Sequence, residues 1–115
     1  MERYDIVIIG TGPAGLSAAI TAKARNKKIL LVGSKDLSPK VEKAHTIQNY
    51  LGLPSVSGEK MAEAFQKHLD DMKIEIAEKK INTVYAMGDY FGIQAGTGML
   101  EANSVILATG VTMDK

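Results

Sequence analysis

The chain has 115 residues, a formal net charge of +1 and a charged fraction of 23%, a composition typical of one small globular domain with a hydrophobic core. The balanced charge creates no field that would recruit nucleic acid or a membrane surface, and the absence of cysteine excludes a disulfide, a thiolate metal site and a dithiol redox centre within the chain. We see neither a membrane span nor a secretion signal, so we expect a cytoplasmic protein.

The beginning of the chain predicts a strand, a helix and a second strand. DIVIIG, residues 5–10, is a continuous apolar run that ends in glycine, as in a strand buried on both faces of a parallel sheet. Residues 13–26 predict a helix rich in small side chains, with a proline in its first turn. KILLVG, residues 28–33, is a second buried strand, so residues 4–33 form one βαβ unit.

The rest of the chain predicts a loop, a helix, a meander and a returning strand. Residues 34–58 show little periodicity, and a loop of that length usually has a function. Residues 59–72 have apolar side chains at helical spacing, and a short strand follows at 73–78. Three alternating segments separated by glycines predict an antiparallel meander over residues 81–104. The apolar run VILAT, residues 105–109, is expected to rejoin the parallel sheet.

Gly10, Gly12 and Gly15 form a G-x-G-x-x-G turn between the first strand and the helix. In this setting the first glycine allows the tight turn, the second lets a pyrophosphate approach the backbone, and the third lets the helix pack on the strand. The phosphates would bind free N–H groups at the positive end of the helix. We therefore predict a dinucleotide pyrophosphate here, and the alternative is a tight turn without a ligand.

The acidic residue that usually binds the ribose hydroxyls is missing from the end of the second strand. That strand ends in Gly33 and Ser34. Asp36 comes slightly late; it could take over the role, although a solvated turn residue is the better explanation. The ribose is then left to Ser34, Lys35 or the backbone.

Three segments together resemble the N-terminal FAD-binding segment of the thioredoxin-reductase-like flavoproteins, which belong to the pyridine nucleotide-disulfide oxidoreductases. The segments are DIVIIGTGPAGLSAA, IQNYLGLP at residues 47–54 and SVILATG at residues 104–110. The resemblance covers essentially the whole chain. It implies an α/β fold, namely a truncated three-layer, Rossmann-like FAD/NAD(P)-binding domain with a parallel sheet, a helix from the βαβ unit, and an antiparallel β-meander crossing the other face.

The resemblance also implies which residues bind FAD. The residues that would hold the pyrophosphate are Gly10, Gly12, Pro13, Ala14 and Gly15. The residues that would lie beside the adenosine ribose are Gly33, Ser34 and Lys35. The remaining contacts would come from Asn49 near the isoalloxazine ring or ribityl chain, from the backbone of Ile81 at the adenine, and from Thr109 and Gly110 at the border of the flavin.

The whole enzyme implied by the resemblance would pass electrons from a reductant, NADPH or another donor, through FAD to the disulfide of a thioredoxin-like protein. The family's redox-active C-x-x-C pair and the later segment that completes the FAD site are both absent from this chain. By itself the chain would therefore not be an enzyme. The family's Gly-Gly-Gln triplet after the second strand is absent too, so contacts to the flavin ring, and the reductant, would differ from the common type. We expect a homo-oligomer.

Two other functions stay open at this point. The chain could be a stand-alone module that binds NAD(P) or another adenine nucleotide, or part of another flavoprotein oxidoreductase such as a monooxygenase. Neither histidine predicts a catalytic or metal site. His45 lies in the polar loop with no visible orienting partner, and His68 lies on the polar side of the amphipathic helix.

Overall fold

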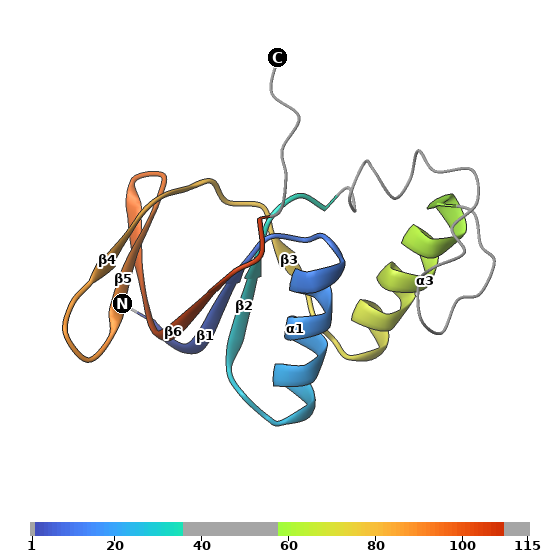
Figure 1. The fold of residues 1–115 in the computed structure, drawn as a ribbon, viewed down its shortest axis with the longest axis horizontal. Helices are drawn as coiled ribbons and strands as arrows, with labels where there is room; N and C mark the ends of the chain where they lie inside the picture. The colour runs from blue at the N-terminus through green and yellow to red at the C-terminus, as the bar shows by residue number, and fades with distance from the viewer. Residues whose placement is uncertain (1, 36–57, 110–115) are drawn as a thin grey trace, which may run out of the picture.

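The structure is a computed structural model that describes residues 2–35 and 58–109 (Figure 1). The elements in chain order are β1 (Arg3–Ile9), α1 (Pro13–Ala24), β2 (Ile29–Val32), α3 (Gly58–Asp71), β3 (Ile76–Ala77), β4 (Ile81–Ala86), β5 (Phe91–Ala95) and β6 (Gly98–Leu107). The strands form one six-stranded sheet in the order β3-β2-β1-β6-β5-β4. Neighbouring strands from β3 to β6 in this order run parallel, and β5 is antiparallel to both β6 and β4.

One long strand joins the parallel and antiparallel parts of the sheet. The first half of β6 pairs with β5, from Ala95↔Gly98 to Phe91↔Ala102. From Glu101 onward, β6 also pairs with β1, as far as Ile9↔Leu107. The sequence predicts a meander strand that ends at residue 104 and a separate returning strand at residues 105–109. The structure has a single strand, since no glycine or proline interrupts residues 99–107.

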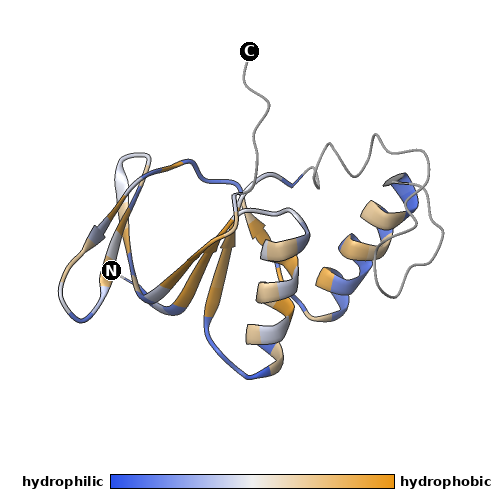
Figure 2. Cartoon of the chain, viewed as in Figure 1, coloured by the Kyte–Doolittle hydropathy of each residue, from blue (hydrophilic) through white to orange (hydrophobic). Residues whose placement is uncertain are grey.

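The predicted α/β fold with three layers is confirmed. Successive residues of a strand point to opposite faces, and β1 shows this directly. Ile8 packs on the helix side, in a buried cluster with Leu16 of α1 and Leu69 of α3. Val7 packs on the meander side, in a second buried cluster with Ile93 of β5. The helices and the meander therefore cover opposite faces of an apolar parallel sheet (Figures 1 and 2).

Helix α3 has the predicted amphipathic character. Met61 and Leu69 are buried, and Met72, just after the helix, packs against the cluster that contains Leu69. Lys73 then reverses the chain with φ +58, a conformation that glycine usually adopts after a helix. This exit turn leaves only Ile76–Ala77 to pair with β2, so the strand predicted at 73–78 is shorter than expected. Among the described residues, no helix is both long and apolar enough to span a membrane.

The amino ends of β1 and β2 are joined by a charged cluster at one edge of the sheet. The Nζ of Lys28 lies 2.8 Å from a carboxylate oxygen of Glu2, and the Tyr4 hydroxyl donates to the other oxygen at 3.0 Å. The backbone N–H of Lys28 donates to Asp5 at 2.7 Å. The hydrogen bond with Lys28 lowers the pKa of Glu2 and raises that of Lys28. Burial and then the Glu2 hydrogen bond raise the pKa of Tyr4.

We expect Glu2→Gln to remove a small contribution to stability that disappears at both ends of the pH range. The lowered pKa of Glu2 means that its pairing stabilises the fold above the unfolded pKa and is lost as pH falls through the folded one. The raised pKa of Lys28 means that the pairing is complete below its unfolded pKa and is lost as pH rises through the folded one. Melting temperatures of both proteins should therefore converge once the pH is below the lowered pKa of Glu2 or above the raised pKa of Lys28. A difference that is constant with pH would contradict this expectation.

Candidate functional site

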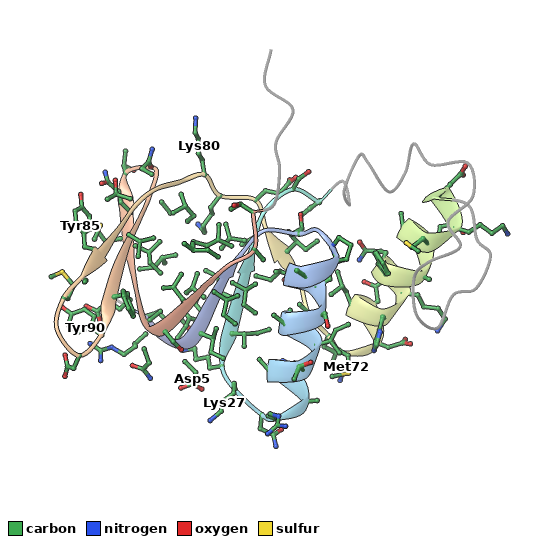
Figure 3. The ribbon with its side chains drawn as sticks, viewed as in Figure 1. Asp5, Lys27, Met72, Lys80, Tyr85 and Tyr90 are labelled. Carbon is green, nitrogen blue, oxygen red and sulfur yellow. The ribbon has the colours of Figure 1, made fainter. Side chains whose placement is uncertain are left out.

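The turn that follows β1 lies at the carboxyl edge of the parallel strands. The N–H of Gly10 donates to the carbonyl of Val32 at the end of β2, at 2.8 Å. On the other side of β1, the N–H of Ala108 donates to the carbonyl of Ile9, also at 2.8 Å. The turn is therefore held between the ends of β2 and β6. Figure 3 shows Asp5 of the charged cluster at the opposite edge of the sheet, whereas Lys80, which follows β3, lies on the same side as the turn.

The three glycines of the turn differ in what surrounds them. Gly10 has φ +124, and a Cβ atom there would overlap the carbonyl oxygen of Ala108. A Cβ atom on Gly15 would overlap the carbonyl oxygen of Gly10, so α1 packs directly on the turn. At Gly12, in contrast, an added Cβ atom would meet no atom of the described residues within 4 Å. Gly10 and Gly15 therefore shape the turn, and Gly12 leaves an open space beside the backbone.

The start of α1 lies beside that open space, and no side chain of the N-cap residue caps its first N–H groups. The first N–H groups of a helix have no intrahelical acceptor, and Gly12, as the N-cap, has no side chain to offer them one. Pro13 occupies the first helical position, and the first turn contains no acidic residue. Within the described residues, the positive end of the helix dipole is thus suited to bind an anion.

Thr11, which the sequence analysis missed, links the turn to the segment after β2. The residue is only 8% exposed, and its hydroxyl donates to the carbonyl of Ser34 at 2.9 Å. Its methyl carbon would lie 2.6 Å from a Cβ atom on Gly33, so no side chain fits there without displacing Thr11. The only signal in the sequence is a β-branched hydroxyl residue between two glycines.

Glu78 is the second residue that the sequence analysis missed. It follows β3, and its carboxylate accepts a hydrogen bond from the backbone N–H of Lys35 at 3.0 Å. The N–H of Gly33 donates to the carbonyl of Ala77 at 3.1 Å, which continues the pairing of β2 with β3 by one residue. Residues 33–35 are therefore fixed from two sides, by Thr11 and by the end of β3. An acidic residue just after a short parallel strand was the available signal.

Most of the predicted site residues meet at this edge of the sheet. They are Gly10, Gly12, Pro13, Ala14, Gly15, Gly33, Ser34, Lys35 and Thr109. The backbone nitrogen of Thr109 would lie 3.1 Å from a Cβ atom on Gly10. Ile81 begins β4, and its side chain packs against the meander-side cluster. Asn49 and Gly110 lie outside the described residues, as does His45, and the cofactor role of every residue named here stays a prediction.

Other parts of the described structure are weaker candidates for a functional site. An open hollow of about 540 Å³ lies at the amino end of β2, lined by Tyr4, Ile29, Leu30, Asp70, Lys73, Ile74 and Glu75. It faces away from the glycine turn and contains none of the predicted site residues. His68 is exposed on α3. Within residues 2–35 and 58–109, no group of histidine and acidic side chains is arranged to hold a metal ion.

The chain is similar to one protein family, to a crystallised reductase and to two curated reductases. Residues 4–115 match the family model described as pyridine nucleotide-disulphide oxidoreductase. A crystal structure of a ferredoxin-flavin thioredoxin reductase from Clostridium acetobutylicum is 56% identical, with a TM-score of 0.95 over 100% of this chain and 40% of that one. Thioredoxin reductase of Treponema pallidum is 37% identical over 93% of this chain, and that of Ureaplasma parvum is 32% identical over 95%. The chain spans 35% of the length of each of these two curated relatives.

Proposed function

The chain belongs to the pyridine nucleotide-disulphide oxidoreductase family, and on that basis we propose that it is the FAD-binding portion of a flavin-dependent reductase for the disulfide of a thioredoxin-like protein. The observation that best supports the proposal is the open space beside Gly12. It lies where a helix begins, at the carboxyl edge of parallel strands, which is where dinucleotides bind in α/β sheets.

The residues at this edge fit the pyrophosphate and adenosine of such a cofactor. The N–H groups of Ala14 and Gly15 in the first turn of α1 would bind the pyrophosphate, with Gly12 leaving room for it. Thr11 would hold Ser34 in place beside the adenosine. A bound flavin would supply the electron transfer itself, and the protein would bind, orient and tune it. The chain contains no cysteine, so a redox-active pair would come from a further part of the protein.

For the electron donor, we favour a ferredoxin over NADPH. The crystallised relative that is named a ferredoxin-flavin thioredoxin reductase is 56% identical to this chain, whereas the two curated thioredoxin reductases are 32% and 37% identical. The missing Gly-Gly-Gln triplet also separates this chain from the common type. In the protein with its further domains, reduced ferredoxin should bleach the flavin absorbance and NADPH should not. Bleaching by NADPH alone would overturn this choice of donor.

We expect FAD to bind to the purified chain through its ADP half. In equilibrium dialysis followed by visible absorbance, ADP should displace FAD, whereas FMN, which lacks the pyrophosphate and adenosine, should not. We expect desalting to remove most of the flavin, since the chain spans only 35% of its curated relatives. Binding of NADP⁺ without binding of FAD would instead support the alternative of a nucleotide-binding module. Equal competition by FMN and ADP would argue against the site at the glycine turn.

A further inference from the structure

We propose that Glu78 supplies the carboxylate that binds the ribose hydroxyls of the adenosine, in place of the acidic residue missing from the end of β2. The inference rests on the proposed function, because it concerns the same nucleotide at the same edge of the sheet. It assigns the ribose to a residue of β3's carboxyl end rather than to Ser34, Lys35 or the backbone.

The pairing of β2 with β3 places Glu78 beside the position where the acid is expected. Val32 is paired with Ala77, and the N–H of Gly33 donates to the carbonyl of Ala77. The next residues along the two strands are Gly33 and Glu78. Neighbouring strands lie about 4.8 Å apart, a distance that the long side chain of a glutamate can span. A carboxylate at Glu78 can therefore reach the region that a side chain at position 33 would occupy.

Thr11 explains why the acid does not stand at position 33 itself. A Cβ atom on Gly33 would lie 2.6 Å from the methyl carbon and 3.0 Å from the hydroxyl oxygen of Thr11. Thr11 is buried, and its hydroxyl is engaged with the carbonyl of Ser34. An aspartate or glutamate at position 33 would have to displace it. In this chain, the threonine that fixes the turn excludes the usual acid, and the adjacent strand provides one instead.

The Glu78 carboxylate is oriented and still has room to accept hydrogen bonds. One of its oxygens accepts the N–H of Lys35 at 3.0 Å, which holds the side chain against the segment that follows β2. An ionised carboxylate has about four lone-pair sites on its two oxygens, so one such bond leaves acceptors for two ribose hydroxyls. Glu78 is exposed at this edge, so a ligand can reach it. Hydroxyl donors to a carboxylate form charge-assisted hydrogen bonds, which are among the stronger ones.

The test compares ligands with and without ribose hydroxyls. ADP and 2′,3′-dideoxy-ADP are titrated into the wild-type chain and into Glu78→Gln, while the backbone amide resonances of Gly12 and Ser34 are followed by NMR. Glu78→Gln keeps an acceptor for Lys35 but removes the charge. Glu75→Gln is the matched control, since Glu75 is an exposed glutamate before β3 that lines the hollow at the other edge.

We expect Glu78→Gln to weaken the binding of ADP about tenfold, which is the usual effect of losing a hydrogen bond to a charged group. The binding of 2′,3′-dideoxy-ADP should not be weakened. The sign is informative, because removal of a negative charge should otherwise strengthen the binding of an anionic ligand. Glu75→Gln should bind both ligands as the wild type does. Equal weakening of both ligands would show that Glu78 merely positions Lys35, and no weakening of ADP would also overturn the inference. If the Gly12 resonance of the wild type does not move with ADP, the proposed function itself fails.

Discussion

Replacement of Gly15 by alanine is expected to lower the free energy of unfolding by about 3 kcal/mol, at the upper end of the usual cost of overpacking. The added Cβ atom would overlap the carbonyl oxygen of Gly10, a backbone atom that cannot rotate away. To relieve the overlap, α1 has to move off the turn, and its buried contact through Leu16 moves with it. Urea unfolding followed by circular dichroism measures the loss.

The sign of the stability change in Gly15→Ala distinguishes packing against the turn from helix propensity. Inside a helix, alanine is more favourable than glycine by about 1 kcal/mol, so a helix free of the turn would gain stability from the same change. Gly12→Ala is the matched control, because its Cβ atom would enter open space and the cost is limited to that of a poorer N-cap, about 1 kcal/mol or less. A stability of Gly15→Ala equal to or above that of the wild type would show that α1 does not pack on the turn as described.

The sequence predicts the fold well because its signals are local. The apolar run of β1 is continuous because Val7 and Ile8 are buried on opposite faces, by the meander and by the helices. The glycine turn is recognisable because its strand and helix are adjacent in the chain. The boundary predicted between residues 104 and 105, in contrast, is wrong, because β6 continues through it while β1 pairs alongside. Pairing between distant segments overrides such local signals.

The candidate site is harder still to predict from local sequence signals. Its three glycines can be recognised because the G-x-G-x-x-G motif covers only six consecutive residues. Thr11 and Glu78, in contrast, act through partners far away in the sequence. Thr11 bonds to Ser34, 23 residues later, and Glu78 bonds to Lys35 across 43 residues. Nothing local to either residue indicates its partner. The missing acid at the end of β2 is visible in the sequence, but the residue that stands beside that position is visible only once the register of β2 and β3 is known.

Replacement of Gly12 by aspartate is expected to abolish nucleotide binding while slightly stabilising the fold. The new carboxylate would occupy the open space beside the start of α1, where the phosphates are proposed to bind. Two like charges about 4 Å apart near a protein surface repel by about 4 kcal/mol, so the affinity for ADP or FAD should fall by at least about a hundredfold. The fold, in contrast, gains an aspartate at an N-cap, and aspartate there is better than glycine by a few tenths of a kcal/mol.

Because nucleotide binding is expected to fall while stability rises slightly, Gly12→Asp tests the proposed site without the confusion of an unfolded protein. Equilibrium dialysis with FAD measures the binding, and urea unfolding measures the stability of the same preparation. Gly12→Ser is the control for bulk and capping, since serine also caps helices well but adds no charge; it should keep more affinity than Gly12→Asp at similar stability. If Gly12→Asp bound FAD as tightly as the wild type, the nucleotide would not approach the backbone at Gly12. The open space there would then be a consequence of the tight turn and not the cradle of a pyrophosphate.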